Sequence, residues 1–313
     1  MADFSNSLSS DLLWLSLSPS LLLDQPKDLG FSLVPRDFLR QDHALIQKIA
    51  QDVALNPDEL QSFLKQHSRT YKVGLYAQAL LEFVLRKLPR YHFLASDWVV
   101  QDPASHRTEG SVDFLLLENT SPQKAIHLEF AVKFYLLDPN APETLASWVG
   151  PEGRDRLDQK VEKIRTQQLP LSQTPHFKSA LSQILGERST DFPEFQRFGL
   201  TRGKVFLPYS SSPLQFRSQW IDPQIERGFY LRQSDPALEN LIKKHPDSFV
   251  LQSKLQWLSP ETVSPPSEDS RSHISAPMVP YIRYFPRLKM SLFVVHDQWP
   301  NPQPRENSFR KQK

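Results

Sequence analysis

The sequence predicts a mixed fold, either α/β or α+β, in which helices flank a sheet and a helical segment precedes it. Three patterns lead to this prediction. Apolar residues recur at steps of three and four before residue 90, alternate with period two through much of residues 91–137, and return to helical spacing from about residue 155. The order of helix, three strands and helix is typical of a sheet that helices cover.

Helices are expected at residues 11–23, 37–54 and 73–88. In the second of these, Ile46, Ile49 and Val53 are spaced to lie on one packed face. Pro89 ends the third because a proline cannot continue the hydrogen-bond ladder of a helix.

Residues 91–100, 110–117 and 125–136 are expected to form three consecutive strands. The last two form a hairpin in which alternate side chains point to opposite faces. The apolar face carries Phe114, Leu116, Ile126, Leu128, Phe130, Val132 and Phe134. The opposite face carries Asp113, His127, Glu129, Lys133 and Tyr135.

The polar face of this hairpin brings two acids together. If the link 118–124 closes symmetrically, Leu117 pairs with Ala125, and Asp113 then lies opposite Glu129 with Cβ atoms about 5 Å apart. Two carboxylates at that distance repel unless a cation, a shared proton or solvent relieves them, and a divalent metal is the sharpest explanation. The alternative is an exposed strand face whose acids point into water, which a one-residue slip in register would allow.

Further elements are expected along the rest of the chain: a helix at 155–169, strands at 204–208, 228–232 and 288–296, and a helix at 236–244. The predicted organisation is an N-terminal helical segment packed on the core (1–70), an α/β core with a C-terminal elaboration (71–258), a loop or linker (259–280), a C-terminal strand (281–299) and a disordered basic tail (300–313).

Composition narrows the classes of ligand and partner. The 313 residues include 37 basic and 35 acidic side chains, so a polyanion such as DNA or RNA would be held by a local patch. The absence of cysteine excludes thiolate metal sites, which leaves oxygen and imidazole ligands and favours Mg²⁺ or Mn²⁺. No signal peptide or membrane span is expected, so a cytoplasmic location without a membrane partner is the simplest hypothesis; the oligomeric state stays open.

Several motifs resemble a family of known fold. They are Gly74-Leu-Tyr, the run from Arg107 through Asp113 to Leu116, the run from His127 through Glu129 and Lys133 to Leu136, Gly150-Pro151 with the run from Asp155 to Lys160, and the run from Lys254 to Pro260. Together they are similar to a bacterial domain family of uncharacterised function that is assigned to the PD-(D/E)XK nuclease superfamily.

The resemblance implies a restriction-endonuclease-like mixed sheet and a metal-dependent phosphodiesterase that acts on DNA or RNA. In such an enzyme Asp113 and Glu129 coordinate Mg²⁺ or Mn²⁺, and Lys133 steadies the attacking water or the charge on the phosphate. An acid from the preceding helix supports the metal. Arg107, Arg156 and Lys160 are candidate contacts to the substrate phosphate, although for Arg156 and Lys160 a solvated charged helix face is the simpler explanation.

Two positions depart from the superfamily pattern. The lysine is expected two residues after Glu129, where this chain has Ala131, and Lys133 lies two residues further on. The helical acid is expected at Gln78, whose amide brings no charge; Glu82, one turn later, is either its replacement or an ordinary glutamate that reaches solvent.

The leading hypothesis is therefore a metal-dependent nuclease with a carboxylate metal site. The alternative is a catalytically inactive nuclease-fold module that binds nucleic acid or protein, which Gln78 and Ala131 favour.

Overall fold

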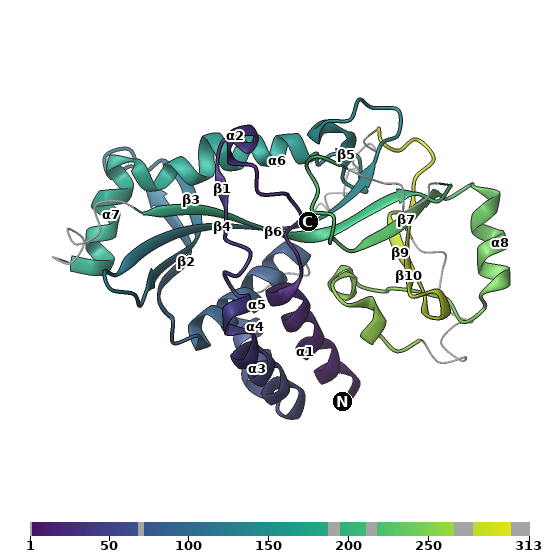
Figure 1. The fold of residues 1–313 in the computed structure, drawn as a ribbon, viewed down its shortest axis with the longest axis horizontal. Coiled ribbons are helices and arrows are strands. Elements are labelled where there is room, and N and C mark those ends of the chain that lie inside the picture. The colour runs from purple at the N-terminus through teal and green to yellow at the C-terminus, as the bar shows by residue number, and fades with distance from the viewer. Residues whose placement is uncertain (1, 68–71, 187–194, 211–217, 266–277, 302–313) are drawn as a thin grey trace, which may run out of the picture.

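The fold is built on one mixed sheet with helices on both faces (Figure 1). The computed structural model describes residues 2–67, 72–186, 195–210, 218–265 and 278–301. Within these residues the main path of the sheet runs β2-β3-β4-β6-β7-β10-β9-β8, and two short strands join it at the side, β1 on β6 and β5 on β4. The predicted sheet flanked by helices, with a helical N-terminal part, is confirmed.

The strands of the main path are β2 (Tyr91–Gln101), β3 (Thr108–Glu118), β4 (Lys124–Leu137), β6 (Gln196–Pro208), β7 (Arg227–Arg232), β10 (Met290–Val295), β9 (Tyr281–Phe285) and β8 (Phe249–Val250). The short strands are β1 (Ser32–Leu33) and β5 (Trp148–Val149). The neighbours β4 and β6, β6 and β7, and β7 and β10 are parallel, and the other pairs of the main path are antiparallel.

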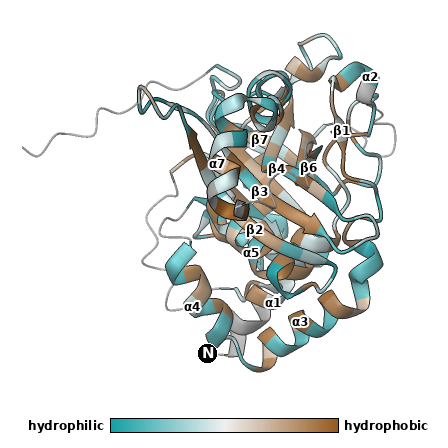
Figure 2. Cartoon of the chain, turned by 90° about the vertical axis from the view of Figure 1, so that its left-hand side faces the viewer, coloured by the Kyte–Doolittle hydropathy of each residue, from teal (hydrophilic) through white to brown (hydrophobic). Residues whose placement is uncertain are grey.

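Helices cover each face of the sheet. One face carries α1 (Ala2–Leu17), α3 (His43–Leu55), α4 (Asp58–His67) and α5 (Val73–Lys87); the other carries α2 (Pro26–Leu29), α6 (Leu157–Lys163) and α7 (Pro175–Leu185), while α8 (Pro236–Lys244) lies at the end near β7 and β10 (Figure 1). The strands are largely hydrophobic and the helices carry hydrophilic residues on their outer sides (Figure 2). A sheet buried on both faces has no room for an unpaired charge.

The apolar face predicted for the hairpin is confirmed. All seven of its residues belong to the large core beneath α1, α3 and α5. The predicted register is also confirmed, because Leu117 pairs with Ala125 and the ladder continues to Phe114 and Leu128.

Several element bounds differ from the predictions. The first helix ends at Leu17, not at residue 23, because Pro19 lacks an amide hydrogen and disfavours helical geometry before it. The helix predicted at 37–54 starts only at His43, after a 3₁₀ turn at Arg40–Asp42. The predicted C-terminal strand is a hairpin of β9 and β10, and α4 and α7 were not predicted. Residues 266–277 of the predicted linker and 302–313 of the predicted tail lie outside the described residues.

Among the described helices, none combines the length and the apolar character that crossing a membrane requires.

A buried acid fastens α1 to the rest of the fold. The carboxylate of Asp11 is 3% exposed, accepts a hydrogen bond from the Tyr76 hydroxyl on α5 at 2.8 Å and another from the Ser259 hydroxyl. Burial outweighs these hydrogen bonds and the nearby Lys204 charge, and it raises the pKa of Asp11 from 3.8 to about 6. The folded protein therefore binds this proton more tightly than the unfolded chain does.

We expect Asp11→Asn to remove part of the pH dependence of stability. Because the folded pKa is raised, the contribution of Asp11 is fully present below pH 4 and is lost as the pH rises through about 6. Urea unfolding of the two proteins should show the wild type losing about 2 kcal/mol relative to Asp11→Asn between pH 4 and pH 7. The control Asp52→Asn, at an exposed position of α3, should follow the wild-type curve within about 0.5 kcal/mol. If the unfolding free energies of wild type and Asp11→Asn differed by the same amount at every pH, the raised pKa of Asp11 would be contradicted.

Candidate functional site

The site lies where β3 separates from β4. Their backbone ladder runs from Glu118 and Lys124 as far as Phe114 and Leu128. At the next step the amide of Phe130 donates a hydrogen bond to Asp113 Oδ2 at 2.8 Å, so a side-chain oxygen receives it. The same register places Asp113 beside Glu129, and we call this place the β3–β4 fork.

Glu129 is held in a continuous chain of hydrogen bonds. Its carboxylate is 1% exposed, with Oε1 2.9 Å from His127 Nε2 and Oε2 accepting from the Gln168 amide. The other ring nitrogen of His127 lies 2.9 Å from Ser172 Oγ. At the other end, Lys160 Nζ donates to Gln168 Oε1 at 2.9 Å. The chain Ser172–His127–Glu129–Gln168–Lys160 therefore joins β4 to the segment that covers it.

The electrostatics of the fork are those of buried acids that face each other. Burial, and after it the charge of Glu129, raises the pKa of Asp113 to about 7, and burial raises the pKa of Glu129 to about 7. Burial also lowers the pKa of His127 to about 4, so its ring is neutral at pH 7. The pKa of Lys160 is lowered by burial although both acids oppose this. The two carboxylates repel each other when both are charged. A proton bound by one of them removes this repulsion, and a positive ion between them would do the same.

A break in the regular helix brings Lys160 and Gln168 together. The helix predicted at 155–169 is α6 followed by a π turn at Ile164–Gln168 and a 3₁₀ turn at Leu169–Gln173. In a regular α-helix, residues eight apart point about 80° away from each other. The extra residue of the π turn offsets much of this difference and places both side chains over Glu129, and such turns are frequent at functional sites.

A cavity of about 480 Å³ adjoins the fork. Between its pairing with β3 and its pairing with β5 at Leu136, β4 has an unpaired edge, and the cavity lies along it. The charged and polar residues that line the cavity are Lys72, Gln78, Lys133, Glu152, Arg154, Asp155, Lys160 and Lys254. Lys160 thus faces both the cavity and the acid pair, which gives a bound anion access to the fork.

The residues expected to assist the acids are placed as follows. Lys133 lines the cavity, but its ammonium group pairs with Asp155 Oδ2 at 2.5 Å and not with the acids. Four residues of strand separate it from Glu129, which is about 13 Å of backbone. Gln78 lines the cavity from α5. The structure does not bring Glu82 to the fork: its buried carboxylate binds Arg86 at 2.7 Å on the face of the sheet that α5 covers.

The three candidate phosphate contacts also separate. Arg107 is exposed in the loop before β3, six residues and about 20 Å of strand from Asp113. Arg156 precedes α6 and pairs with Asp158 at 2.6 Å. Only Lys160 reaches the fork.

Gln168 and Ser172 were missed from the sequence. Their spacing from Lys160 matches no regular helical face, so the signal was absent until the π turn was known. The available hint was only that Gln168 and Ser172 flank the short apolar run from Leu169 to Leu171, which packs against the sheet.

The acid pair matches what a magnesium site needs from protein. Within the described residues, no three Asp, Glu or His side chains are arranged around a common metal position. Mg²⁺, however, is usually held by one or two carboxylates, with water and substrate phosphate as its other ligands. Glu129, which is buried, and Asp113, which is half-buried, lie beside an accessible cavity and fit that donor set.

We expect Asp113→Asn to stabilise the protein at pH 8 in the presence of a chelator. The substitution removes the negative charge of half-buried Asp113 beside buried Glu129 and keeps an oxygen that can accept from Phe130, so unfolding free energy should rise by roughly 1–3 kcal/mol. The control Asp158→Asn breaks a surface ion pair and should change it by less than about 1 kcal/mol. Denaturant titration measures both. If Asp113→Asn and Asp158→Asn changed the unfolding free energy by the same amount, the Asp113 carboxylate would be solvated.

Comparison with known proteins identifies the family. The family model described as a domain of unknown function, DUF1853, matches residues 10–283. Neither the search of curated proteins nor the search of solved structures returned a match. The match includes both strands of the fork and the covering segment with Lys160 and Gln168, and it spans most of the chain, which therefore belongs to the DUF1853 family.

Proposed function

We propose that this protein is a metal-dependent nuclease of the PD-(D/E)XK type that hydrolyses phosphodiesters in DNA or RNA. The observation that supports the proposal best is the acid pair at the β3–β4 fork, which two neighbouring strands hold together beside a cavity rich in lysine. Paired buried carboxylates with raised pKa values are more typical of functional sites than of structural ones.

Each residue of the fork has a role in this proposal. Asp113 and Glu129 would hold Mg²⁺ or Mn²⁺, which when bound neutralises phosphate charge and lowers the pKa of a water molecule. His127 and Gln168 fix the Glu129 carboxylate by hydrogen bonds to both of its oxygens. Lys160 supplies the positive charge that the superfamily pattern places at position 131. Its side chain lines the cavity where a scissile phosphate would enter, and its charge interacts with both acids.

A second candidate is a nuclease-fold module that binds nucleic acid without cleaving it. The observation in its favour is that both oxygens of Glu129 already have hydrogen-bond partners in the protein, so the network is complete without an ion. Gln78 at the position of the expected acid supports the same reading.

Manganese titration by calorimetry tests the metal site. Wild type should bind Mn²⁺ at pH 8, and Asp113→Asn and Glu129→Gln should bind it at least about tenfold more weakly, because each removes one charged ligand. The matched control Glu162→Gln changes an exposed glutamate of α6 that pairs with Arg165, and it should bind as wild type does. If wild type fails to bind Mn²⁺, the enzyme proposal is wrong.

Cleavage of labelled single-stranded and duplex DNA and RNA then separates the two candidates. The nuclease predicts metal-dependent cleavage that falls by about 100-fold or more in the acid variants and in Lys160→Met. Lys133→Met, which breaks only the contact with Asp155, should retain most activity. Metal binding together with nucleic-acid binding but no cleavage would favour the module.

A further inference from the structure

A second polar pocket lies beside β6, the strand that pairs with β4. Along the edge of β6 that faces away from β4, β1 pairs only at Phe198 and Gly199, and β7 pairs only from Val205 onward. The segment 18–24, which leads from α1 on one face to α2 on the other, crosses this gap, and the amide of Leu21 donates to the Thr201 carbonyl at 3.0 Å. A cavity of about 150 Å³ lies beside the crossing.

The pocket contains a buried arginine without an acidic partner. Arg202 on β6 is 7% exposed, and its guanidinium donates to the carbonyls of Leu15 at 2.9 Å and Ser16 at 3.3 Å, at the end of α1. Among the described residues no carboxylate forms an ion pair with it. Burial, and after it the charge of Arg40, lowers the pKa of Arg202 to about 10, which still leaves it charged at neutral pH.

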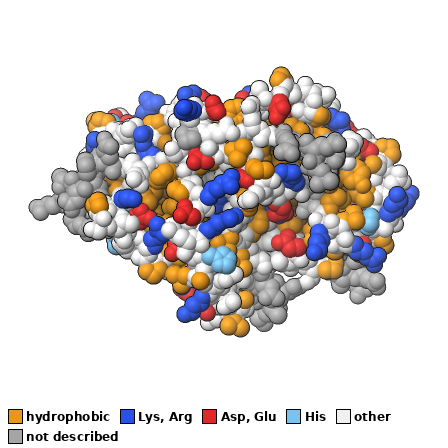
Figure 3. Space-filling view, viewed as in Figure 1, with side chains coloured by type: hydrophobic (Ala, Val, Ile, Leu, Met, Phe, Trp, Pro, Cys, Tyr) orange, Lys and Arg blue, Asp and Glu red, His pale blue; other side chains and the backbone are white. Residues whose placement is uncertain are grey.

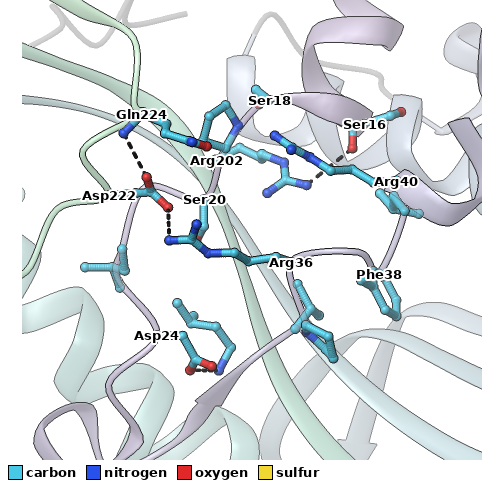
Figure 4. A pocket seen from close by; sticks show the side chains of 16 residues that line it. Ser16, Ser18, Ser20, Asp24, Arg36, Phe38, Arg40, Arg202, Asp222 and Gln224 are labelled. Carbon is cyan, nitrogen blue, oxygen red and sulfur yellow. Dashed lines mark hydrogen bonds and ion pairs between the residues drawn. The ribbon is translucent and has the colours of Figure 1, made fainter.

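Positive charge exceeds negative charge around this cavity. Arg36, Arg40 and Arg202 line it, against Asp24 and Asp222. Asp222 pairs with Arg36 at 3.3 Å and Asp24 accepts from the Leu33 amide, so both acids already have partners. The guanidinium groups of Arg40 and Arg202 approach each other from opposite sides of the pocket (Figure 4). Basic side chains also gather in the middle of the face shown in Figure 3, over the N-terminal segments that lead from α1 to α3.

Two hydroxyl groups at the pocket have no hydrogen-bond partner within the described structure. They are Ser16 Oγ, on a residue that is 0% exposed, and Ser18 Oγ, which is inaccessible to solvent. Both residues line the cavity. Buried hydroxyls are normally satisfied, so each of these lacks an expected acceptor. Neither is exposed to the cavity in this conformation, and each would reach a bound acceptor only after its side chain rotates.

Capping of α1 explains only part of this arrangement. Arg202 stabilises the end of the helix by binding its last carbonyls, which accounts for one side of the guanidinium. It accounts neither for Arg40, whose charge opposes Arg202, nor for the two unpaired hydroxyls. An oxyanion in the cavity would accept hydrogen bonds from both arginines, and from the hydroxyls once their side chains rotate toward it. The cavity is roughly ten times the minimum that holds one water molecule.

We propose that this pocket binds the phosphate group of a small ligand, held by Arg40, Arg202 and the hydroxyl of Ser16. The site lies at the unpaired edge of β6, separate from the β3–β4 fork, and does not depend on the nuclease proposal.

Calorimetric titration of the full chain with inorganic phosphate tests the site. The titration is done with a chelator and at constant ionic strength. Wild type should bind one phosphate with a dissociation constant of about 1 mM or below. Arg40→Gln, at an exposed position whose loss the fold tolerates, should weaken binding about tenfold or more because a charge-assisted hydrogen bond is lost. The matched control Arg287→Gln removes an exposed arginine near α8 and should bind as wild type does.

Ser16→Ala separates a binding site from a purely structural cluster. Without phosphate this variant should be as stable as wild type or more stable, since it removes a buried hydroxyl that lacks a partner. The affinity of Ser16→Ala for phosphate should be clearly weaker than that of wild type.

Glu129→Gln should leave phosphate binding unchanged, which excludes binding at the fork. Glycerol phosphate that binds at least as tightly as inorganic phosphate would support a ligand-borne phosphate group; weaker binding would restrict the site to the free ion and overturn that part of the proposal. Wild-type affinity in both Arg40→Gln and Ser16→Ala, or no saturable binding by wild type, would overturn it entirely.

Discussion

The constraint on which the structure of the site depends is the forced proximity of Asp113 and Glu129. The register of the β3–β4 hairpin places them on adjacent strands and on the same face, and α6 with its π turn closes over them. Neither acid can move away without breaking a backbone ladder, so their repulsion is relieved by protons, by Lys160 or by a cation. This unfavourable arrangement is maintained by the core on the opposite face of the same strands, where Phe114, Leu128 and Phe130 are buried.

Both candidate sites occur where the sheet interrupts its own pairing. On one edge of β4, the ladder stops at Leu128 and resumes with β5 at Leu136, and the larger cavity occupies the interval. On the outer edge of β6, pairing with other strands stops at Gly199 and resumes at Val205; the segment 18–24 crosses that interval, and the arginine pocket lies beside the crossing. Unpaired edges leave backbone and side-chain groups free to bind ligands while the rest of the sheet stays rigid. The two strands lie side by side, so two sites of different chemistry share one scaffold.

The sequence predicted the sheet, the hairpin register and the acid pair, because alternation over a long hairpin with a symmetric link leaves few alternatives. It did not reveal that Lys160, and not Lys133, accompanies the acids, since the π turn that aligns Lys160 with Gln168 has no local signal. Glu82 matched a helical spacing but lies under the other face of the sheet, which spacing along one helix cannot reveal. Arg202 was missed for a similar reason: its guanidinium binds the end of α1, which lies nearly two hundred residues away in sequence.

The most direct measurement for the central claim is anomalous diffraction from crystals of this protein soaked in Mn²⁺ near pH 8. If the acid pair holds a metal, one strong anomalous peak should lie within coordination distance of both Asp113 and Glu129, and the Glu129 carboxylate should have turned from at least one of its present hydrogen bonds. A peak elsewhere, or an unchanged hydrogen-bonded network at the fork under saturating Mn²⁺, would contradict that claim.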